Sequence, residues 1–133
     1  MTNIKAPPSI LLVEDNSDLL ENLSLTLEGA GYQTLTAGNG LEALAVLHAQ
    51  PVDLILSDIN MPNIEGYQLY KLVRENHRWA TIPFLFLTGC RFISDAEIRY
   101  GKALGIYEYL TKPIQPEDLL SAISNVIQKH NIH

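Results

Sequence analysis

Five polar residues stand at or just past the ends of short apolar runs, and their types could support phosphoryl transfer. Three are carboxylates, one is a hydroxyl and one is an ammonium: Glu14, Asp15, Asp58, Thr88 and Lys112. If they met, the carboxylates would repel, and one would be expected to stay protonated unless a cation were present. Ligands that are all oxygen, with no His or Cys in the pattern, select a hard metal such as Mg²⁺. The lysine and the threonine could then bind phosphate oxygens, so the set predicts a phosphoryl-transfer site.

Strand and helix patterns alternate along the chain and indicate how these residues would be positioned. Short continuous apolar runs, typical of strands buried on both faces, precede the polar positions. A further run, Tyr32–Thr36, alternates apolar and polar residues and is expected nearer a sheet edge. The expected strands cover residues 9–13, 32–36, 52–57, 82–87 and 107–110.

Helical patterns follow each strand, and several carry start signals. Asn39 and Glu42 resemble a capping box, Ser94 and Glu97 form a second one, and Pro116 suits a first helical position. We expect helices from about Leu19 to Ala30, from Asn39 to before Pro51, from Ile64 to about Asn76, from Ser94 towards Leu104, and from Pro116 onwards. Apolar residues on their inner faces are expected to include Leu23, Leu27, Leu41, Leu44, Leu47, Leu69, Leu72, Val73, Leu119 and Ile123.

This order of elements predicts an α/β fold, with a parallel five-stranded sheet covered by helices on both faces. All strands of a parallel sheet point the same way, so residues past their C-terminal ends meet at one edge. In open α/β sheets this edge is where ligands bind. The five polar residues are far apart in sequence, yet this topology gathers them into a single predicted site.

The same constellation resembles the receiver domain of two-component response regulators, of the chemotaxis-regulator type. The resemblance rests on Glu14-Asp15, Asp58 with Met61-Pro62 and Gly66, Thr88, and Tyr109-Leu110-Thr111-Lys112-Pro113, in this order at successive strand ends. It covers about residues 9–130. It implies a flavodoxin-like, doubly wound (βα)5 sandwich with strand order 2-1-3-4-5. Residues 8–133 would form one receiver domain, behind a flexible segment of residues 1–7.

The resemblance also implies how phosphate and metal would be bound. Asp58 would accept a phosphoryl group from a phosphohistidine of a sensor histidine kinase or a histidine phosphotransfer protein. Asp15 would bind Mg²⁺ directly and Glu14 directly or through water, together with Asp58 and the main-chain carbonyl of Asn60. Lys112 would pair with Asp58 and then with the phosphoryl group.

A switch is implied by the remaining matching residues. Thr88 would turn its hydroxyl towards the phosphate, and Tyr109 would follow by rotating inward. This change would remodel the surface of the fourth helix, fifth strand and fifth helix, where an effector domain or protein would bind. The Lys112–Pro113 bond is expected to be cis, since X–Pro bonds adopt cis at little cost. Gly89 stands where receivers often have Ala, and would leave more room beside the phosphoryl group.

Two other functions remain open at this point. An aspartate-nucleophile phosphohydrolase acting on small molecules would also use Asp58, Lys112 and Mg²⁺. Such enzymes usually carry a second acid two residues after the nucleophile, where this chain has Asn60. A constitutive interaction module would keep the fold without the chemistry, against which the intact motifs argue. We therefore expect a phosphoprotein of signal transduction that catalyses only its own phosphorylation and dephosphorylation.

Composition and charge narrow the class of protein further. A chain of 133 residues that is 47% hydrophobic suits one globular domain. With one cysteine, Cys90, and no run long enough to span a membrane, we expect a cytoplasmic protein with no membrane partner. The net charge of −6 argues against direct nucleic-acid binding. We expect no effector segment after the last helix, so a single-domain regulator, a phosphorelay intermediate and a receiver cut from a larger protein stay open, as do a monomer and a phosphorylation-dependent dimer.

Few other residues suggest chemistry. The four histidines share no metal-ligand spacing and are expected on the surface. Trp79 falls in a polar stretch and is expected to be exposed or partly packed. Cys90 is expected to be a small loop residue near the site, because no electropositive partner for its thiol is identifiable.

Overall fold

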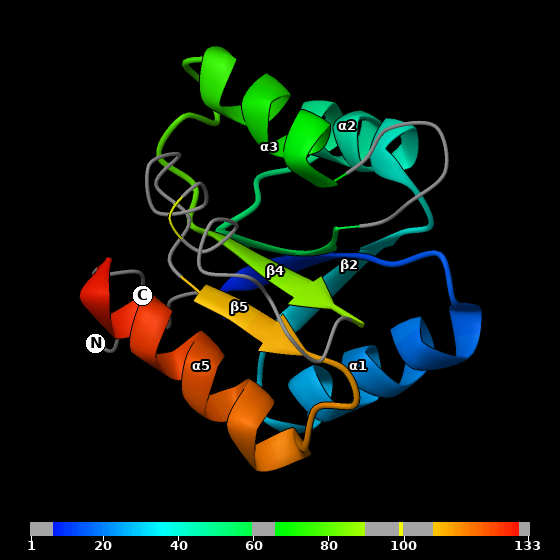
Figure 1. The fold of residues 1–133 in the computed structure, drawn as a ribbon. Helices are drawn as coiled ribbons and strands as arrows, with labels where there is room; N and C mark the ends of the chain where they lie inside the picture. The colour runs from blue at the N-terminus through cyan, green and yellow to red at the C-terminus, as the bar shows by residue number, and fades with distance from the viewer. Residues whose placement is uncertain (1–6, 60–65, 90–98, 100–107, 131–133) are drawn as a thin grey trace, which may run out of the picture.

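Five parallel strands form one sheet with helices on both sides. The computed structural model describes residues 7–59, 66–89, 99 and 108–130. The strand order is β2-β1-β3-β4-β5, and each neighbouring pair is parallel. In chain order (Figure 1), the elements are β1 (Ser9–Val13), α1 (Ser17–Gly29), β2 (Gln33–Ala37), α2 (Gly40–Ala49), β3 (Leu54–Asp58), α3 (Gly66–Glu75), β4 (Phe84–Thr88), β5 (Glu108–Thr111) and α5 (Pro116–Lys129). The predicted α/β, doubly wound sheet is confirmed, and β2 is at an edge as expected. The helix expected from Ser94 lies outside the described residues, apart from Arg99.

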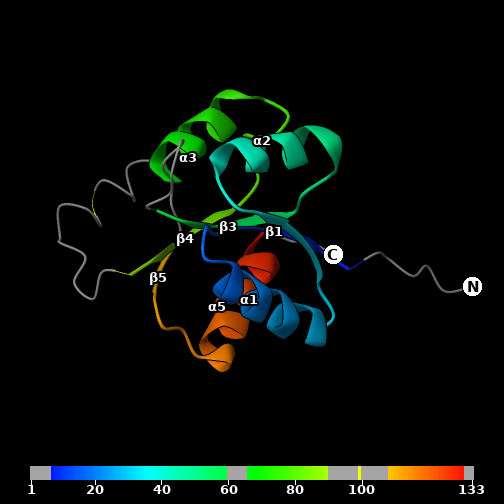
Figure 2. The same ribbon diagram turned by 90° about the vertical axis from the view of Figure 1, so that its right-hand side faces the viewer.

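Side chains that alternate along the strands divide the core into two layers. One layer lies against α2 and α3, and its strand residues are Leu11, Val13, Ala37, Ile55, Phe84 and Phe86. The other lies against α1 and α5, and its strand residues are Ile10, Leu12, Leu54, Leu56, Leu85, Leu87 and Leu110. Figure 2 shows the sheet edge-on between these two pairs of helices. The central strands are buried on both faces, which explains why their sequences are continuously apolar.

The strand predictions are right in number and place, and their ends move by at most two residues towards the C-terminus. This shift matters for the site, because Asp58 and Thr88 become the last residues of β3 and β4. Asp58 pairs with Leu87, and Thr88 pairs with Thr111, in the register of the sheet. The sheet therefore fixes the backbone of both residues, which the sequence pattern had placed just past the strands.

The helix starts follow local capping chemistry. The Asn39 side chain accepts a hydrogen bond from the Glu42 N–H at 2.9 Å, and Glu42 accepts one from the Gly38 N–H at 3.0 Å. The predicted capping box is confirmed. Asn16 caps α1 in a similar way, by accepting from the Leu19 N–H at 3.1 Å. Local signals of this kind can be read from sequence because both partners lie within four residues.

Trp79 is buried, contrary to the expectation that it would be exposed or partly packed. Its side chain is 6% exposed and belongs to the core layer under α2 and α3. The His48 imidazole of α2 meets the indole ring edge-on, with ring centroids 4.7 Å apart. A contact between distant segments thus decides the environment of Trp79, and its polar sequence neighbours do not.

Two leucines expected on the inner faces of helices point to solvent instead. Leu41 is 55% exposed and Leu72 is 40% exposed. The buried stripe of each helix follows i, i+3, i+4 and i+7 spacing. In α3 this stripe is Gly66, Leu69, Tyr70 and Val73, and in α2 it contains Gly40, Ala43 and Leu47. Both leucines fall outside the stripe, and Tyr70 takes the core position that Leu72 was expected to fill.

Candidate functional site

Three carboxylates meet at the C-terminal edge of the sheet. Glu14 and Asp15 directly follow β1, and Asp58 ends the neighbouring strand β3. One carboxylate oxygen from each residue lies within 4.8 Å of the other two. Glu14 and Asp58 are buried and Asp15 is exposed, so the group opens to solvent on the Asp15 side. The topology gathers these residues as the strand ends indicated.

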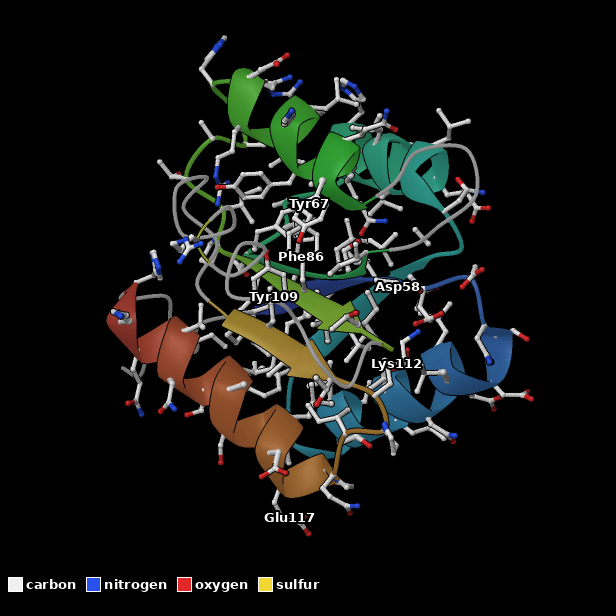
Figure 3. The ribbon with its side chains drawn as sticks, in the orientation of Figure 1. Asp58, Tyr67, Phe86, Tyr109, Lys112 and Glu117 are labelled. Carbon is white, nitrogen blue, oxygen red and sulfur yellow. The ribbon has the colours of Figure 1, made fainter. Side chains whose placement is uncertain are left out.

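Lys112, the residue directly after β5, brings a positive charge into this group. Its Nζ lies 2.6 Å from Glu14 Oε1 and 3.2 Å from Asp58 Oδ2. Lys112 and Asp58 lie together at the arrowhead end of the strands in Figure 3. Because both carboxylates are buried and the ammonium is only partly exposed, these ion pairs are screened less than pairs on an open surface. Lys112 therefore ties the end of β5 to the ends of β1 and β3.

Burial and ion pairing set the protonation of two of these groups. Burial raises the pKa of Glu14 above its usual 4.5, although the Lys112 ammonium and the Asn16 N–H, which donates to Glu14 Oε2 at 3.0 Å, act to lower it. Burial alone would lower the pKa of Lys112, but the Glu14 and Asp58 carboxylates outweigh it and hold that pKa above 10.5. Lys112 is thus a cation at neutral pH, and Glu14 keeps a proton more readily than an ordinary glutamate.

The donor set fits a hard divalent cation. Mg²⁺ takes oxygen ligands at about 2.0–2.1 Å, which places the ligand oxygens roughly 3–4 Å from one another. The three carboxylate oxygens need only a small adjustment from their spread of 4.8 Å. Three carboxylates face one ammonium here, and the raised pKa of Glu14 reflects burial that this ammonium does not fully offset. Asn60, whose main-chain carbonyl was expected as a further ligand, lies outside the described residues.

A close approach of α3 supports the backbone that carries Asp58. The Gly66 N–H donates to the Ile59 carbonyl at 2.7 Å, which ties the start of α3 to the end of β3. A Cβ atom on Gly66 would lie 2.5 Å from the Asp58 carbonyl oxygen and 2.9 Å from a ring carbon of Phe86. Only glycine fits at this distance. Gly66 therefore shapes the support of the acidic group, as its place in the motif indicated.

Of the two expected switch residues, Thr88 ends the strand next to that of Asp58, and Tyr109 lies further back on β5. Thr88 is buried at the end of β4, and its carbonyl accepts a hydrogen bond from the Lys112 N–H at 2.7 Å. Tyr109 of β5 is half-buried, and its ring stacks on Phe86 with centroids 5.8 Å apart. Its hydroxyl oxygen is 2.9 Å from the hydroxyl oxygen of Tyr67. In this structure the Tyr109 ring already packs against the core layer on the α3 side.

The loops after β4 and β5 agree with the expectations wherever they are described. The Lys112–Pro113 peptide bond is cis, as expected. Gly89 is exposed, and a Cβ atom there would meet no atom of the described residues within 4 Å; room beside a phosphoryl group stays a prediction. Cys90 lies outside the described residues.

Sequence reasoning missed Tyr67. The sequence holds a signal for it, because Tyr67 and Tyr70 are three residues apart and thus share one face of a helix. Phe84, Phe86 and Tyr109 lie on strands that this face covers, but the rotation of α3 that pairs Tyr67 with Tyr109 is a tertiary property. The local pattern does not contain it.

Among the described residues, no helix is long and apolar enough to cross a lipid bilayer.

Comparison with known proteins finds similarity along nearly the whole chain. Residues 10–124 match the family described as the response regulator receiver domain. The chain is 37% identical over 125 residues to the probable transcriptional regulator ycf29 of Porphyra purpurea, covering 94% of this chain and 59% of that protein. It is 33% identical over 124 residues to response regulator Rre1 of Synechocystis sp., covering 92% of this chain and 53% of that protein. The chain thus spans little more than half the length of these two relatives.

Solved structures show the same likeness. The chemotaxis protein CheY4 of Vibrio cholerae is similar with a TM-score of 0.84 at 37% identity, covering 91% of this chain and 99% of that chain. A CheY-like receiver domain protein from Methanospirillum hungatei is similar with a TM-score of 0.84 at 26% identity, covering 94% of this chain and 97% of that chain. Neither a small-molecule phosphohydrolase nor a constitutive interaction module finds support in these matches.

Proposed function

Because the chain belongs to the response regulator receiver domain family, we propose that Asp58 accepts a phosphoryl group and that the protein passes this state to a partner. A receiver domain of two-component response regulators is a signalling domain. We assign the donor to a sensor histidine kinase or a histidine phosphotransfer protein. The readout belongs to an effector that binds the surface including β5 and α5.

The observation that carries the proposal is the position of Lys112 between two buried carboxylates. Its ammonium reaches Asp58 at 3.2 Å and Glu14 at 2.6 Å, and Asp15 stands exposed beside them. An aspartate that only caps a helix or closes a turn needs neither a partly buried ammonium nor two further carboxylates beside it. The cluster supports a role in which Asp58 reacts, while Lys112 and the other two carboxylates set the local charge around it.

The transfer would form a bond between an Asp58 carboxylate oxygen and phosphorus and break the phosphorus–nitrogen bond to the donor histidine. Charge is spread over the phosphoryl oxygens during this passage, and a preorganised cation stabilises it. Lys112 already points at Asp58 and would take this role. Glu14, Asp15, Asp58 and the carbonyl of Asn60 would hold Mg²⁺, which when bound supplies positive charge for the phosphoryl oxygens.

After transfer, the Thr88 hydroxyl would turn towards the phosphoryl group and Tyr109 would respond on β5. The Thr88 carbonyl and the Lys112 N–H share a hydrogen bond at 2.7 Å, so the ends of β4 and β5 are joined next to the acceptor. A change at Asp58 would therefore be transmitted through the joined ends of β4 and β5 to the surface that β5 forms with α5.

The test is phosphorylation of the full chain by acetyl phosphate with and without Mg²⁺, followed by intact mass spectrometry. We expect one added phosphoryl group that requires Mg²⁺, and none on the Asp58→Asn variant. The matched control is Asp18→Asn, which changes an exposed aspartate of α1 outside the cluster and should label like the wild type. Unchanged labelling of Asp58→Asn would refute the proposal.

A further inference from the structure

The hydroxyl groups of two tyrosines meet on the side of the sheet that α3 covers. Tyr67 lies in the first turn of α3 and Tyr109 lies in β5, and their hydroxyl oxygens are 2.9 Å apart. This is a hydrogen-bond distance, in which either hydroxyl can be the donor. The two residues are 42 positions apart in sequence, so the fold alone brings them together. The pair connects α3 directly to the strand that carries the proposed switch residue.

Phe86 of β4 is the surface on which both tyrosines pack. It is fully buried, and it is the register neighbour of Tyr109 across the β4–β5 pair. The Phe86 ring stacks with Tyr109 at 5.8 Å and an interplanar angle of 22°, and contacts the tilted Tyr67 ring at 5.0 Å. Figure 3 shows Tyr67, Phe86 and Tyr109 one above another between α3 and β5. Among the described residues, the inward position of Tyr109 is thus supported by the Phe86 ring face and the Tyr67 hydroxyl.

The hydroxyl contact adds what ring packing cannot supply. Ring stacking tolerates sliding, whereas a hydrogen bond fixes the relative position of two oxygen atoms. A tyrosine hydroxyl that turns into a partly buried place needs a partner there, because a polar group left unpaired carries a desolvation cost. Tyr67 provides such a partner for the inward ring of Tyr109, and it belongs to an element anchored at Gly66 beside Asp58.

We propose that Tyr67 is a positioning residue of the switch, whose hydroxyl holds Tyr109 inward before a phosphoryl group arrives. This inference rests on the proposed function, in which Tyr109 reports the state of Asp58. It gives the unphosphorylated protein a large inward population, and it makes α3 part of the switch. Any group bound at Asp58 that favours the inward ring acts on the same equilibrium, so the two effects are reciprocal.

The test uses the full chain with ring ¹³C-labelled tyrosine and the variant Tyr67→Phe, which keeps the ring and removes the hydroxyl. NMR of the Tyr109 ring, assigned by its loss in Tyr109→Phe, reports the ring position through its contact with Phe86. Removing one hydrogen bond should change the inward-to-outward ratio by a factor of about 2 to 10. We expect a smaller inward population in Tyr67→Phe without any phosphoryl donor or metal.

Tyr70→Phe is the matched control. Tyr70 lies on the same helix and packs on the same ring, Phe86, at 6.2 Å, but its hydroxyl accepts from the Arg74 side chain at 3.3 Å. Its loss removes a tyrosine hydroxyl from the same aromatic cluster without touching the pair with Tyr109. The Tyr109 signal should stay as in the wild type in this variant. An equal shift in both variants would mean a general loosening of the cluster and would overturn the proposal.

A second measurement separates this inference from the proposed function. Beryllofluoride with Mg²⁺, a mimic of the phosphoryl group, should bind Tyr67→Phe more weakly, by no more than the factor measured for the ring. If beryllofluoride binds neither the wild type nor Tyr67→Phe, the acceptor role of Asp58 is refuted. The metal-free NMR result then still decides whether the Tyr67 hydroxyl holds Tyr109 inward. If beryllofluoride binds both proteins equally and the Tyr109 ring is unchanged, the acceptor role stands and the role of Tyr67 is refuted.

Discussion

A single ammonium balances only part of the negative charge that the three carboxylates bring together. Lys112 lies within 3.2 Å of both Glu14 and Asp58, and its own pKa is raised by them although burial opposes this. Glu14 is 2% exposed, and its burial raises its pKa even with Lys112 and the Asn16 N–H in contact. A proton and a divalent cation therefore compete for the same buried oxygen atoms.

This competition predicts a pH dependence of Mg²⁺ binding. Carboxylates bind the metal only when deprotonated, and the pKa of Glu14 lies above 4.5, so affinity should begin to fall at a pH above that value as the solution is acidified. Calorimetric Mg²⁺ titrations of wild type, Glu14→Gln and Glu21→Gln across this range provide the measurement. Glu14→Gln should bind more weakly and show a flatter pH profile, and Glu21→Gln, changed at an exposed α1 position, should match the wild type. An equally steep profile in Glu14→Gln would contradict this assignment.

At the scale of elements, the site depends on how closely α3 approaches the end of β3. Gly66 allows this approach, because any Cβ atom at that position would collide with the Asp58 carbonyl oxygen at 2.5 Å. The atoms that this Cβ atom would meet belong to the backbone of residues 58 and 59 and to the buried Phe86 ring, and neither moves easily in a packed interior. The backbone geometry at Asp58 thus depends on Gly66, which has no side chain that could take part in chemistry.

Gly66→Ala should therefore lower the free energy of unfolding by about 1–3 kcal/mol, the usual cost of overpacking. Gly89→Ala is the control, since a Cβ atom there meets no atom of the described residues within 4 Å and the backbone needs no positive φ. Its effect should stay within about 1 kcal/mol in either direction. Urea unfolding of the two variants measures both values. Equal stability of Gly66→Ala and the wild type would show that the close approach is not a constraint.

The elements also show what the sequence could and could not predict. Strand positions and caps were predictable because their causes are local: an apolar run, or an Asn39–Glu42 pair three residues apart. The meeting of Glu14, Asp58 and Lys112 followed from the direction of parallel strands. The burial of Trp79 was not predictable because it depends on a contact between distant segments, and the exposure of Leu72 was not predictable because it depends on how α3 is rotated against the sheet. The contact between the Tyr67 and Tyr109 hydroxyl groups was not predictable either, because it too depends on the rotation of α3.

For the whole molecule, the parallel sheet is what turns scattered residues into a site. Asp58 and Lys112 are 54 positions apart, and they meet at the C-terminal edge of the sheet. Both faces of this sheet are covered by a hydrophobic core layer. Three of the acidic residues behind the net charge of −6 cluster at this edge of the sheet: Glu14, Asp15 and Asp58. The fold is shared with CheY4 of Vibrio cholerae at a TM-score of 0.84. We therefore propose that the chain acts as one switch, with the phosphoryl acceptor at the C-terminal edge of the sheet and the readout on β5.

The central claim is that Asp58 is the residue that carries the phosphoryl group. The most direct test treats the protein with acetyl phosphate and Mg²⁺, reduces any acyl phosphate with borohydride, and locates the modified residue by peptide mass spectrometry. This reduction converts an aspartyl phosphate to homoserine, which marks the site permanently. If Asp58 is the acceptor, we expect homoserine at position 58 and at no other aspartate. Homoserine at Asp15 or another aspartate, or none in a sample that had gained a phosphoryl group, would contradict it.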